Sequence, residues 1–256
     1  MVESVQSTDG TTITYETAGS GPVLILVGGA MNTRHSAGDL VPLLAEDFSV
    51  ITFDRRGRGE STNTPPYAVE REVEDFQALV AGVGGSACVY GHSSGGILAL
   101  EAAAAGVEIS KLAVYEPPYA TSEGDDGLWQ VFVDKVQSLV DEGHSDQAVE
   151  EFIRHTGAGF DERMKQSPWW PAMVALAPTL PYDLALAADG VVPVERLGRI
   201  SAPVLALYGG ASAAWAETAT AEVSMAVQNG RQDVIEGQTH AAAPDSVAPT
   251  LLQFFH

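Results

Sequence analysis

The sequence has few basic residues: its 256 positions hold 13 Lys and Arg against 34 Asp and Glu, for a formal net charge of −21 at pH 7. So acidic a chain lacks the basic surface that neutralises nucleic-acid phosphates or anionic lipid headgroups. We therefore expect neither nucleic acid nor a membrane as a partner. One local exception, where a negatively charged substrate could bind, is a group of four arginines: Arg34, Arg55, Arg56 and Arg58.

Cysteines and long apolar segments are also scarce. Cys88 is the only cysteine, which excludes an internal disulfide, and its apolar neighbours indicate a small buried residue. The first residues, Met1 to Ser4, have neither the basic start nor the apolar stretch of a signal peptide. Apolar runs such as 22–27 are too short to span a bilayer. These absences predict a cytoplasmic protein.

What the sequence does contain is a regular succession of short apolar runs and stretches with helical spacing. Continuous apolar runs separated by helices predict a mostly parallel sheet that is covered on both faces. The predicted strands are 12–17, 23–27, 49–53, 87–90, 112–115, 204–208 and 233–235. The predicted helices between and after them are 36–46, 69–82, 95–105, 213–227 and 244–255.

The pattern changes between the fifth and sixth of these runs. Residues 119–198 contain no buried strand and instead fit amphipathic helices at 128–140, 146–156 and 170–188. We interpret 119–198 as a helical cap over the carboxyl edge of the sheet. Residues 1–118 and 199–256 then form the α/β core domain.

The segment Gly91-His92-Ser93-Ser94-Gly95 lies between a predicted buried strand and a predicted helix. The flanking glycines allow a sharp turn that exposes a strained serine at the carboxyl end of the strand, and the helix start supplies backbone N–H groups. This context favours Ser93 as a nucleophile over a solvent-facing serine in an ordinary turn.

A serine nucleophile needs a base, and the base needs a group that orients it. His240 follows the last predicted strand, on a loop that can reach the carboxyl edge of the sheet. We therefore expect His240 to be the base. The other histidines fit less well, since they lie in an early loop, beside the nucleophile but pointing away, in the cap or at the terminus: His35, His92, His144, His155 and His256.

With these features the chain resembles the α/β-hydrolase superfamily over nearly its whole length. The Ser93 turn and the segment 54–61, which looks like the superfamily's D-x-R-G-x-G-x-S, carry the resemblance. It implies the α/β-hydrolase fold, with helices on both faces of the sheet and a helical cap inserted after strand six. It also implies an oxyanion hole formed by the backbone N–H groups of Ala30 and Ser94. Gly28 stands where members usually have a histidine that braces this loop.

The orienting acid departs from the superfamily's common pattern. Members usually carry an aspartate after the seventh strand, where this chain has Ser212, and a serine cannot supply negative charge to an imidazolium. Some members, including zearalenone-type lactonases, place the acid after strand six, and Glu116 matches that position. The strand-end position suits Glu116 even without the resemblance, and better than it suits Asp54 or Asp245. The alternative is that Glu116 only caps a turn or pairs with an arginine.

The predicted substrate contacts lie in the cap and in loops at the catalytic edge. Aromatic residues of cap helices more often belong to a core than to a pocket, yet Trp169 and Trp170 are candidates for the wall of an apolar cleft. We expect a neutral, fairly hydrophobic substrate held by Gly29, Met31, His92, Trp129, Trp169, Trp170 and Trp215.

Together these residues predict a serine hydrolase that cleaves a carboxylic ester or lactone through an acyl-enzyme on Ser93. It would need no metal or cofactor, and it would act on a small molecule as a monomer or homodimer. The same residues could instead serve perhydrolysis, acyl transfer or a biosynthetic cyclisation. A catalytically silent receptor is a further alternative, which Ser212 at the usual position of the acid favours.

Overall fold

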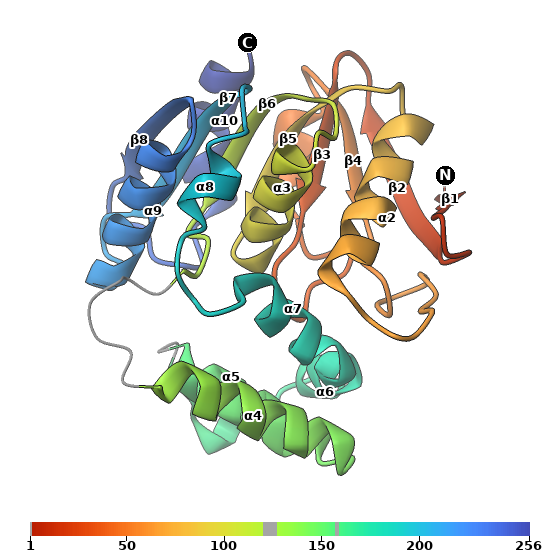
Figure 1. Ribbon diagram of the computed structural model, residues 1–256, viewed down its shortest axis with the longest axis vertical. Coiled ribbons are helices and arrows are strands. Elements are labelled where there is room, and N and C mark those ends of the chain that lie inside the picture. The colour runs from red at the N-terminus through yellow and green to blue at the C-terminus, as the bar shows by residue number, and fades with distance from the viewer. Residues whose placement is uncertain (1, 120–126, 157–158) are drawn as a thin grey trace.

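One eight-stranded sheet runs through the computed structural model, which describes residues 2–119, 127–156 and 159–256 (Figure 1). The strand order is β1-β2-β4-β3-β5-β6-β7-β8, with β1 and β2 antiparallel at one edge and parallel pairing from β4 to β8. The strands are β1 Val2–Gln6, β2 Thr12–Gly19, β3 Val23–Val27, β4 Ser49–Phe53, β5 Ala87–His92, β6 Ile109–Tyr115, β7 Pro203–Gly209 and β8 Asn229–Ile235.

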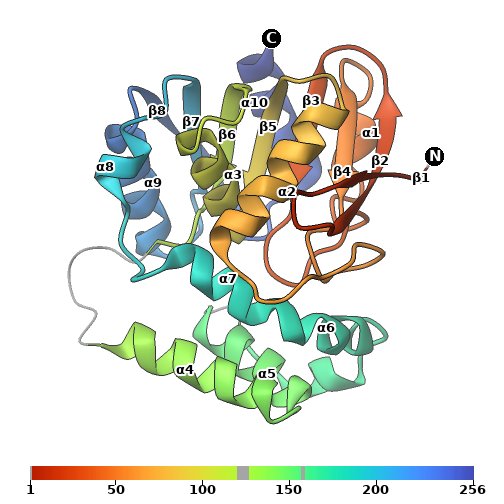
Figure 2. The ribbon, with the colours of Figure 1, turned by 45° about the vertical axis from the view of Figure 1, so that its right-hand side comes forward.

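Helices cover both faces of the sheet and form a separate group beyond one of its ends (Figures 1 and 2). The helices that belong to the α/β core are α1 Leu40–Leu44, α2 Val69–Gly82, α3 Ser94–Ala104, α8 Val194–Leu197, α9 Ala214–Ala226 and α10 Pro244–Phe255. The cap segment contains α4 Leu128–Asp141, α5 Ser145–His155, α6 Trp170–Leu176 and α7 Leu180–Ala187, with short 3₁₀ turns at Glu162–Gln166 and Ala177–Thr179.

The central strands are buried on both faces, as their continuous apolar runs predict. In β3, Leu24 and Leu26 join an apolar cluster with residues of α1 and α10, whereas Ile25 and Val27 join one with residues of α2 and α3. Successive side chains of a strand point to opposite faces, so this alternation places one helical layer on each side of the sheet. The fold is therefore the α/β-hydrolase fold that the sequence predicts.

The chain between β4 and α2 is organised around the buried carboxylate of Asp54. This carboxylate accepts hydrogen bonds from the backbone N–H of Arg34 at 2.7 Å and of Glu60 at 3.0 Å. Gly59 has φ +52°, and a Cβ there would lie 2.2 Å from Asp54 Oδ2, so only glycine lets the turn close on the carboxylate. Asp54 thus has a structural task, in agreement with its lower rank as a catalytic acid.

The structure differs from the sequence prediction most clearly in the cap. The single helix predicted over 170–188 is broken into α6, a 3₁₀ turn and α7. Prolines stand at positions 171, 178 and 181, and each lacks the backbone N–H that continues a helix. The predicted helix over 36–46 is likewise reduced to α1. The exposed edge strand β1 was not predicted, because it has no buried apolar run.

The cap has an apolar cluster of its own. Its buried members run from Phe132 to Leu184, whereas Leu186 and the buried residues after it pack in the main core. In both views α7 lies between α4–α6 and the sheet (Figures 1 and 2). The helix therefore forms the physical junction between the cap and the core.

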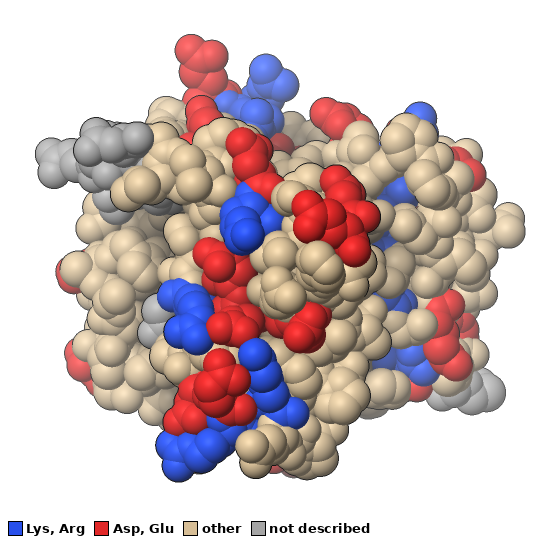
Figure 3. All heavy atoms as spheres, turned by 90° about the horizontal axis from the view of Figure 1, so that it is seen from below, with Lys and Arg blue, Asp and Glu red and all other residues tan. Residues whose placement is uncertain are grey.

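The cap side of the molecule carries acidic and basic side chains intermingled (Figure 3). Within the cap, Arg154 and Lys165 pair with Glu150, and Arg163 pairs with Asp161. Solvent screens exposed pairs of this kind, so they do little for stability. They do neutralise three of the cap's basic side chains with nearby acids.

Candidate active site

Ser93 occupies a sharp turn between β5 and α3. Its backbone has φ 56° and ψ −130°, a strained conformation for a residue with a side chain. The turn is tight because glycines permit close approach: a Cβ on Gly91 would lie 2.6 Å from the Gly95 carbonyl oxygen, and one on Gly29 would lie 2.8 Å from Ser93 Cβ. The predicted geometry of a nucleophile turn is present at Ser93.

Glu116 and His240 meet at the same edge of the sheet. Glu116 directly follows β6, with φ 46° and no solvent exposure, and its Oε2 lies 2.7 Å from His240 Nδ1. Oε1 accepts hydrogen bonds from the Gly209 N–H at 2.8 Å and from the Ser212 hydroxyl. Burial alone would raise the pKa of Glu116, but the bonds from His240, Ser212 and Gly209 outweigh it and lower that pKa. The carboxylate is therefore charged beside His240.

Ser212 lies next to Glu116 and does not replace it as the acid. Its hydroxyl donates to the carboxylate oxygen of Glu116 that does not face His240. The serine at the superfamily's usual acid position thus supports Glu116 through a hydrogen bond from the loop that follows β7. Sequence reasoning noted Ser212 only as a missing acid, since nothing in the linear order reveals this contact.

His92 anchors the loop that carries His240. Its Nε2 lies 2.8 Å from the His240 carbonyl oxygen, and the Tyr115 hydroxyl donates to the neighbouring Thr239 carbonyl at 2.7 Å. Burial, and next to it the proximity of His240, lowers the pKa of His92 to about 4, so its ring is neutral at pH 7. A neutral ring has a single N–H, which must be on Nε2 for this bond to form. The contact with the His240 carbonyl shows that His92 helps to hold this loop. A contact between His92 and the substrate stays a prediction.

The loop after β3 supplies one of the two predicted oxyanion donors. Gly29 packs directly on Ser93, and Ala30 follows it, while Ser94 opens α3 on the other side of the turn. Within the described parts of the chain, neither the Ala30 N–H nor the Ser94 N–H has a hydrogen-bond acceptor. The first N–H groups of a helix have no intrahelical partner, which explains the vacancy at Ser94. Two donors that have no acceptor among the described residues therefore flank Ser93.

The other predicted substrate contacts are spread over two regions. Met31 packs, with Ala30, against the apolar cluster of the cap, and the Trp215 ring centroid lies 6.2 Å from that of His240. Trp170 is buried in the cap cluster, Trp169 is half exposed, and the Trp129 indole donates to the Ala188 carbonyl at 2.9 Å. Trp215 thus lies near His240, and Met31 lies two residues after Gly29, which packs on Ser93. A substrate role for any of the five stays a prediction.

The four arginines that could have formed a local exception to the acidic surface are not free to bind an anionic substrate. All four are buried, with exposed fractions between 0 and 9%. Each is already paired with carboxylates: Arg34 with Glu16, Asp54 and Glu60, Arg55 with Glu72 and Asp183, Arg56 with Asp9 and Asp75, and Arg58 with Asp183. Asp183 was not recognised in the sequence, because it lies in the cap helix and its partners lie more than a hundred residues away.

In the described ranges, no group of three or more His, Cys, Asp or Glu side chains is arranged to hold a metal ion. No helix in those ranges is long and apolar enough to cross a membrane.

Comparison with known proteins supports the fold at several levels. A structure of an alpha/beta hydrolase from Sphaerobacter thermophilus is 44% identical, with a TM-score of 0.90 over 99% of this chain and 100% of that chain. The esterase RhEst1 from Rhodococcus sp. ECU1013 is 20% identical, with a TM-score of 0.75 over 99% of this chain and 98% of that one, a likeness of fold alone.

Curated proteins match over shorter segments. The uncharacterized hydrolase YraK of Bacillus subtilis is 33% identical over 96 residues, which cover 36% of this chain and 35% of that protein. The proline iminopeptidase PfmaB of Pestalotiopsis fici is 30% identical over 106 residues, covering 39% and 37% of the two chains. The matched segments thus span little more than a third of these relatives' length.

Residues 23–250 match the model of the Alpha/beta hydrolase family, a span that runs from the start of β3 into α10 and includes every residue of the Ser93, Glu116 and His240 site. With the observed sheet order, the serine turn and this match, the chain belongs to the alpha/beta hydrolase family.

Proposed function

We propose that this hydrolase is a serine esterase or lactonase that forms an acyl-enzyme on Ser93. The observation that carries the proposal is the placement of a strained Ser93 turn and a His240–Glu116 pair, with 2.7 Å between Nδ1 and Oε2, at one edge of the sheet. Nucleophile Ser93, orienting acid Glu116 and base His240 follow one another in the chain order expected for this fold. The order and the geometry support the same assignment independently.

The reaction would begin with proton transfer from the Ser93 hydroxyl. Glu116 holds the Nδ1 proton of His240, which leaves Nε2 able to accept the serine proton. The serine oxygen attacks the carbonyl carbon, and the imidazolium that forms is stabilised by the buried carboxylate. His240 then returns the proton to the departing alcohol. A water molecule, deprotonated by His240, then attacks the acyl carbon. The bond between that carbon and the Ser93 oxygen breaks, His240 returns the proton to Ser93, and the acid is released.

The negative charge on the carbonyl oxygen of the tetrahedral intermediate would be held by the Ala30 and Ser94 N–H groups. One such donor is typically worth about 3–4 kcal/mol of the barrier. The absence of another acceptor for either group in the described residues supports this role. The positive φ of Met31, 56°, marks a further strained backbone position directly after Ala30, as expected where a loop is shaped for chemistry.

Two features support the more specific likeness to lactonases with the acid after strand six. Glu116 follows β6 and is fully enclosed, and Ser212 donates to it from the end of β7. A neutral, fairly hydrophobic ester or lactone agrees with the packing of Ala30 and Met31 against the apolar cap cluster. A panel of p-nitrophenyl esters and of lactones graded in ring size would separate the two substrate classes by kcat/KM.

A fluorophosphonate probe tests the nucleophile directly, because it labels only an activated serine. Wild-type protein should be labelled, and Ser93→Ala should lose both labelling and turnover of p-nitrophenyl butyrate. Ser86→Ala is the matched control, since this exposed serine precedes the other end of the same strand. Labelling that persists in Ser93→Ala would contradict the assignment. Absence of labelling and turnover in the wild type would favour the silent receptor.

A further inference from the structure

The Gly29–Ala30 peptide bond carries a constraint on the proposed oxyanion hole. In a trans peptide the C=O and N–H bonds lie in one rigid plane and point in opposite directions within it. The contacts of the Gly29 carbonyl therefore decide where the Ala30 N–H points. That carbonyl accepts a hydrogen bond from Arg58 Nη1 at 2.6 Å and a longer one from the Asn32 N–H at 3.3 Å. Arg58 makes the shorter of the two contacts, at the carbonyl end of this peptide and opposite to the Ala30 N–H.

Arg58 is itself rigidly held. It is 1% exposed, and its Nη2 donates to both carboxylate oxygens of Asp183 at 2.8 Å. Its Nε has no partner among the described residues, an uncommon state for a buried donor. The two terminal nitrogens of the guanidinium therefore bind Gly29 and Asp183, while Nε has no hydrogen-bond acceptor among the described residues. A planar guanidinium held at two nitrogens has little freedom to turn.

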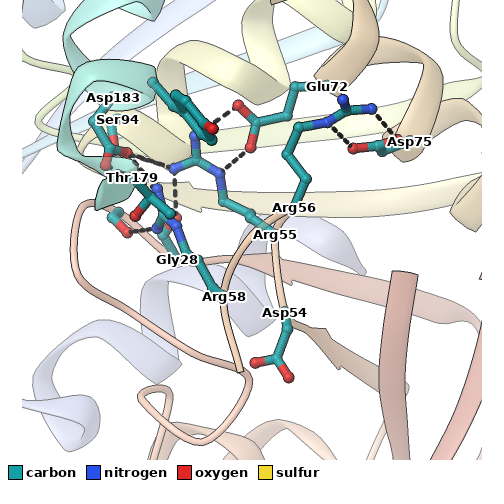
Figure 4. Close-up of polar contacts among 12 residues, drawn as sticks. Gly28, Asp54, Arg55, Arg56, Arg58, Glu72, Asp75, Ser94, Thr179 and Asp183 are labelled. Atoms are coloured by element: carbon teal, nitrogen blue, oxygen red, sulfur yellow. Dashed lines mark hydrogen bonds and ion pairs between the residues drawn. The ribbon is translucent and has the colours of Figure 1, made fainter. Parts of the chain in front are cut away.

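Asp183 also contacts the element that carries the second oxyanion donor. Besides Arg58, its Oδ1 accepts from the Ser94 hydroxyl at 2.7 Å and from Arg55 Nη1 at 2.7 Å. Figure 4 shows this carboxylate on α7 beside Ser94, with Arg55 reaching between Asp183 and Glu72. One buried carboxylate of the cap junction therefore holds Ser94 directly and the Gly29–Ala30 peptide through Arg58.

We propose that Arg58 is a positioning residue of the oxyanion hole, and that Asp183 couples the docking of α7 to the geometry of both donors. The inference rests on the proposed esterase function, since it assigns a role within that site. Arg58 touches no reacting atom. It fixes the plane of the Gly29–Ala30 peptide, so that the Ala30 N–H is aimed before the substrate arrives. A cap that did not seat α7 would leave the hole unformed.

The decisive variant removes the donor to Gly29 without leaving excess charge. Arg58→Met alone leaves one buried carboxylate unbalanced, so the preferred variant is Arg58→Met/Glu72→Gln. Glu72 itself contacts only Arg55 and the Tyr67 hydroxyl among these residues. Arg55 reaches the Gly28 carbonyl at 3.5 Å and the Ser94 hydroxyl at 3.3 Å, so Glu72→Gln alone is needed as a control for any effect through Arg55. We expect kcat for p-nitrophenyl butyrate to fall about 10–100-fold with KM unchanged within about twofold. Removal of a whole donor costs about 10²–10³, and a misdirected donor should cost less.

The affinity for a transition-state analogue distinguishes a positioning role from a purely structural one, because a purely structural role would leave that affinity unchanged. An alkyl trifluoromethyl ketone forms a hemiketal with the serine whose oxyanion needs the same donors, so its Ki should rise by the same factor as kcat falls. Two matched controls, Glu72→Gln and Arg56→Met, should lower the melting temperature yet leave kcat within about twofold. Arg56 is equally buried and pairs with Asp75, away from this loop.

The outcomes separate this inference from the function beneath it. If the wild type neither turns over the ester nor reacts with the fluorophosphonate, the proposed function fails. If the wild type is active but the double variant retains its kcat and Ki, the positioning role is overturned. Equal kcat losses in the double variant and in Arg56→Met would also overturn it, because the cause would then be general destabilisation.

Discussion

Glu116 and Asp183 are two buried carboxylates with different partners. Each accepts several hydrogen bonds, and their exposed fractions are 0 and 4%. Burial would raise both pKa values. For Glu116 the bonds from His240, Ser212 and Gly209 lower its pKa, and for Asp183 the charges of Arg58 and Arg55 do so. Both are therefore ionised, but Glu116 faces an imidazole and Asp183 faces two guanidinium groups.

The partner determines at which stage each carboxylate stabilises a full positive charge. A guanidinium is charged at all ordinary pH values, so Asp183 is part of a complete ion cluster in the resting protein. An imidazole becomes fully charged only when it takes up a proton, which in the proposed reaction happens at the transition state. Loss of Glu116 should therefore appear chiefly in the rate, and loss of Asp183 chiefly in the stability.

The largest effect is expected for Glu116→Gln. The amide keeps the shape of the side chain and can still accept from Gly209, but it offers no charge to the His240 imidazolium. We expect kcat for p-nitrophenyl butyrate to fall about 10³–10⁴-fold, by analogy with loss of the acid in the Ser-His-Asp triad, with only a small change in melting temperature. A loss below about tenfold would return the role of the acid to another group.

The second prediction concerns Asp183→Asn. This change leaves Arg55 and Arg58 buried around a neutral amide, and breaking such a pair typically costs about 3–5 kcal/mol of unfolding free energy. Urea unfolding should show this loss, with a smaller decrease in kcat than Glu116→Gln produces. Asp75→Asn, which deprives buried Arg56 of its partner, is the control and should lower stability without the decrease in kcat. Equal kcat in the two variants would show that Asp183 has no link to the site.

The same two carboxylates show how far the sequence could lead. Glu116 was singled out by the resemblance to members that carry the acid after strand six, and its place at the end of an apolar strand run agrees with that role, because the carboxyl ends of parallel strands meet at one edge. Ser93 and His240 were found from their places in the sequence, each directly after a predicted strand and before a predicted helix. Their positions follow from local patterns, strand then turn, that a linear sequence displays. The family resemblance added the oxyanion residues but not the contact by which Ser212 supports Glu116.

Asp183 could not be found, because its place depends on how the cap packs. The helical spacing over 170–188 predicts one helix, while the prolines divide it and turn the α7 portion onto α3. Arg55 and Asp183 are 128 residues apart, and no local signal connects them. The arginines were therefore assigned to the surface, although burial with acids removes them from it.

The smallest expected effect is the contribution of His92 to the pH dependence of stability. His92 also extends the comparison of Glu116 and Asp183 to a titratable group without a charged partner. This ring is buried without a carboxylate at hydrogen-bond distance in the described structure, so its folded pKa falls from 6.5 to about 4. Between those values the unfolded chain binds a proton that the folded chain does not, so stability is lost as the pH falls from 6.5 towards 4. At 1.36 kcal/mol per pKa unit, the loss should be about 2–3 kcal/mol.

His92→Gln should remove this dependence, because the glutamine amide can donate to the His240 carbonyl but does not titrate. Urea unfolding of both proteins at intervals between pH 4 and pH 7 measures the difference. Glu116 and Asp183 act in a lower window, since a lowered carboxyl pKa gives stability that is lost only as the pH falls below about 4.5 and 3.8. A wild-type curve that stays flat down to pH 5 and falls only below it would mean that the ring is charged in the fold. A negatively charged group would then have to lie close to the His92 ring, just as basic partners lie close to Glu116 and Asp183.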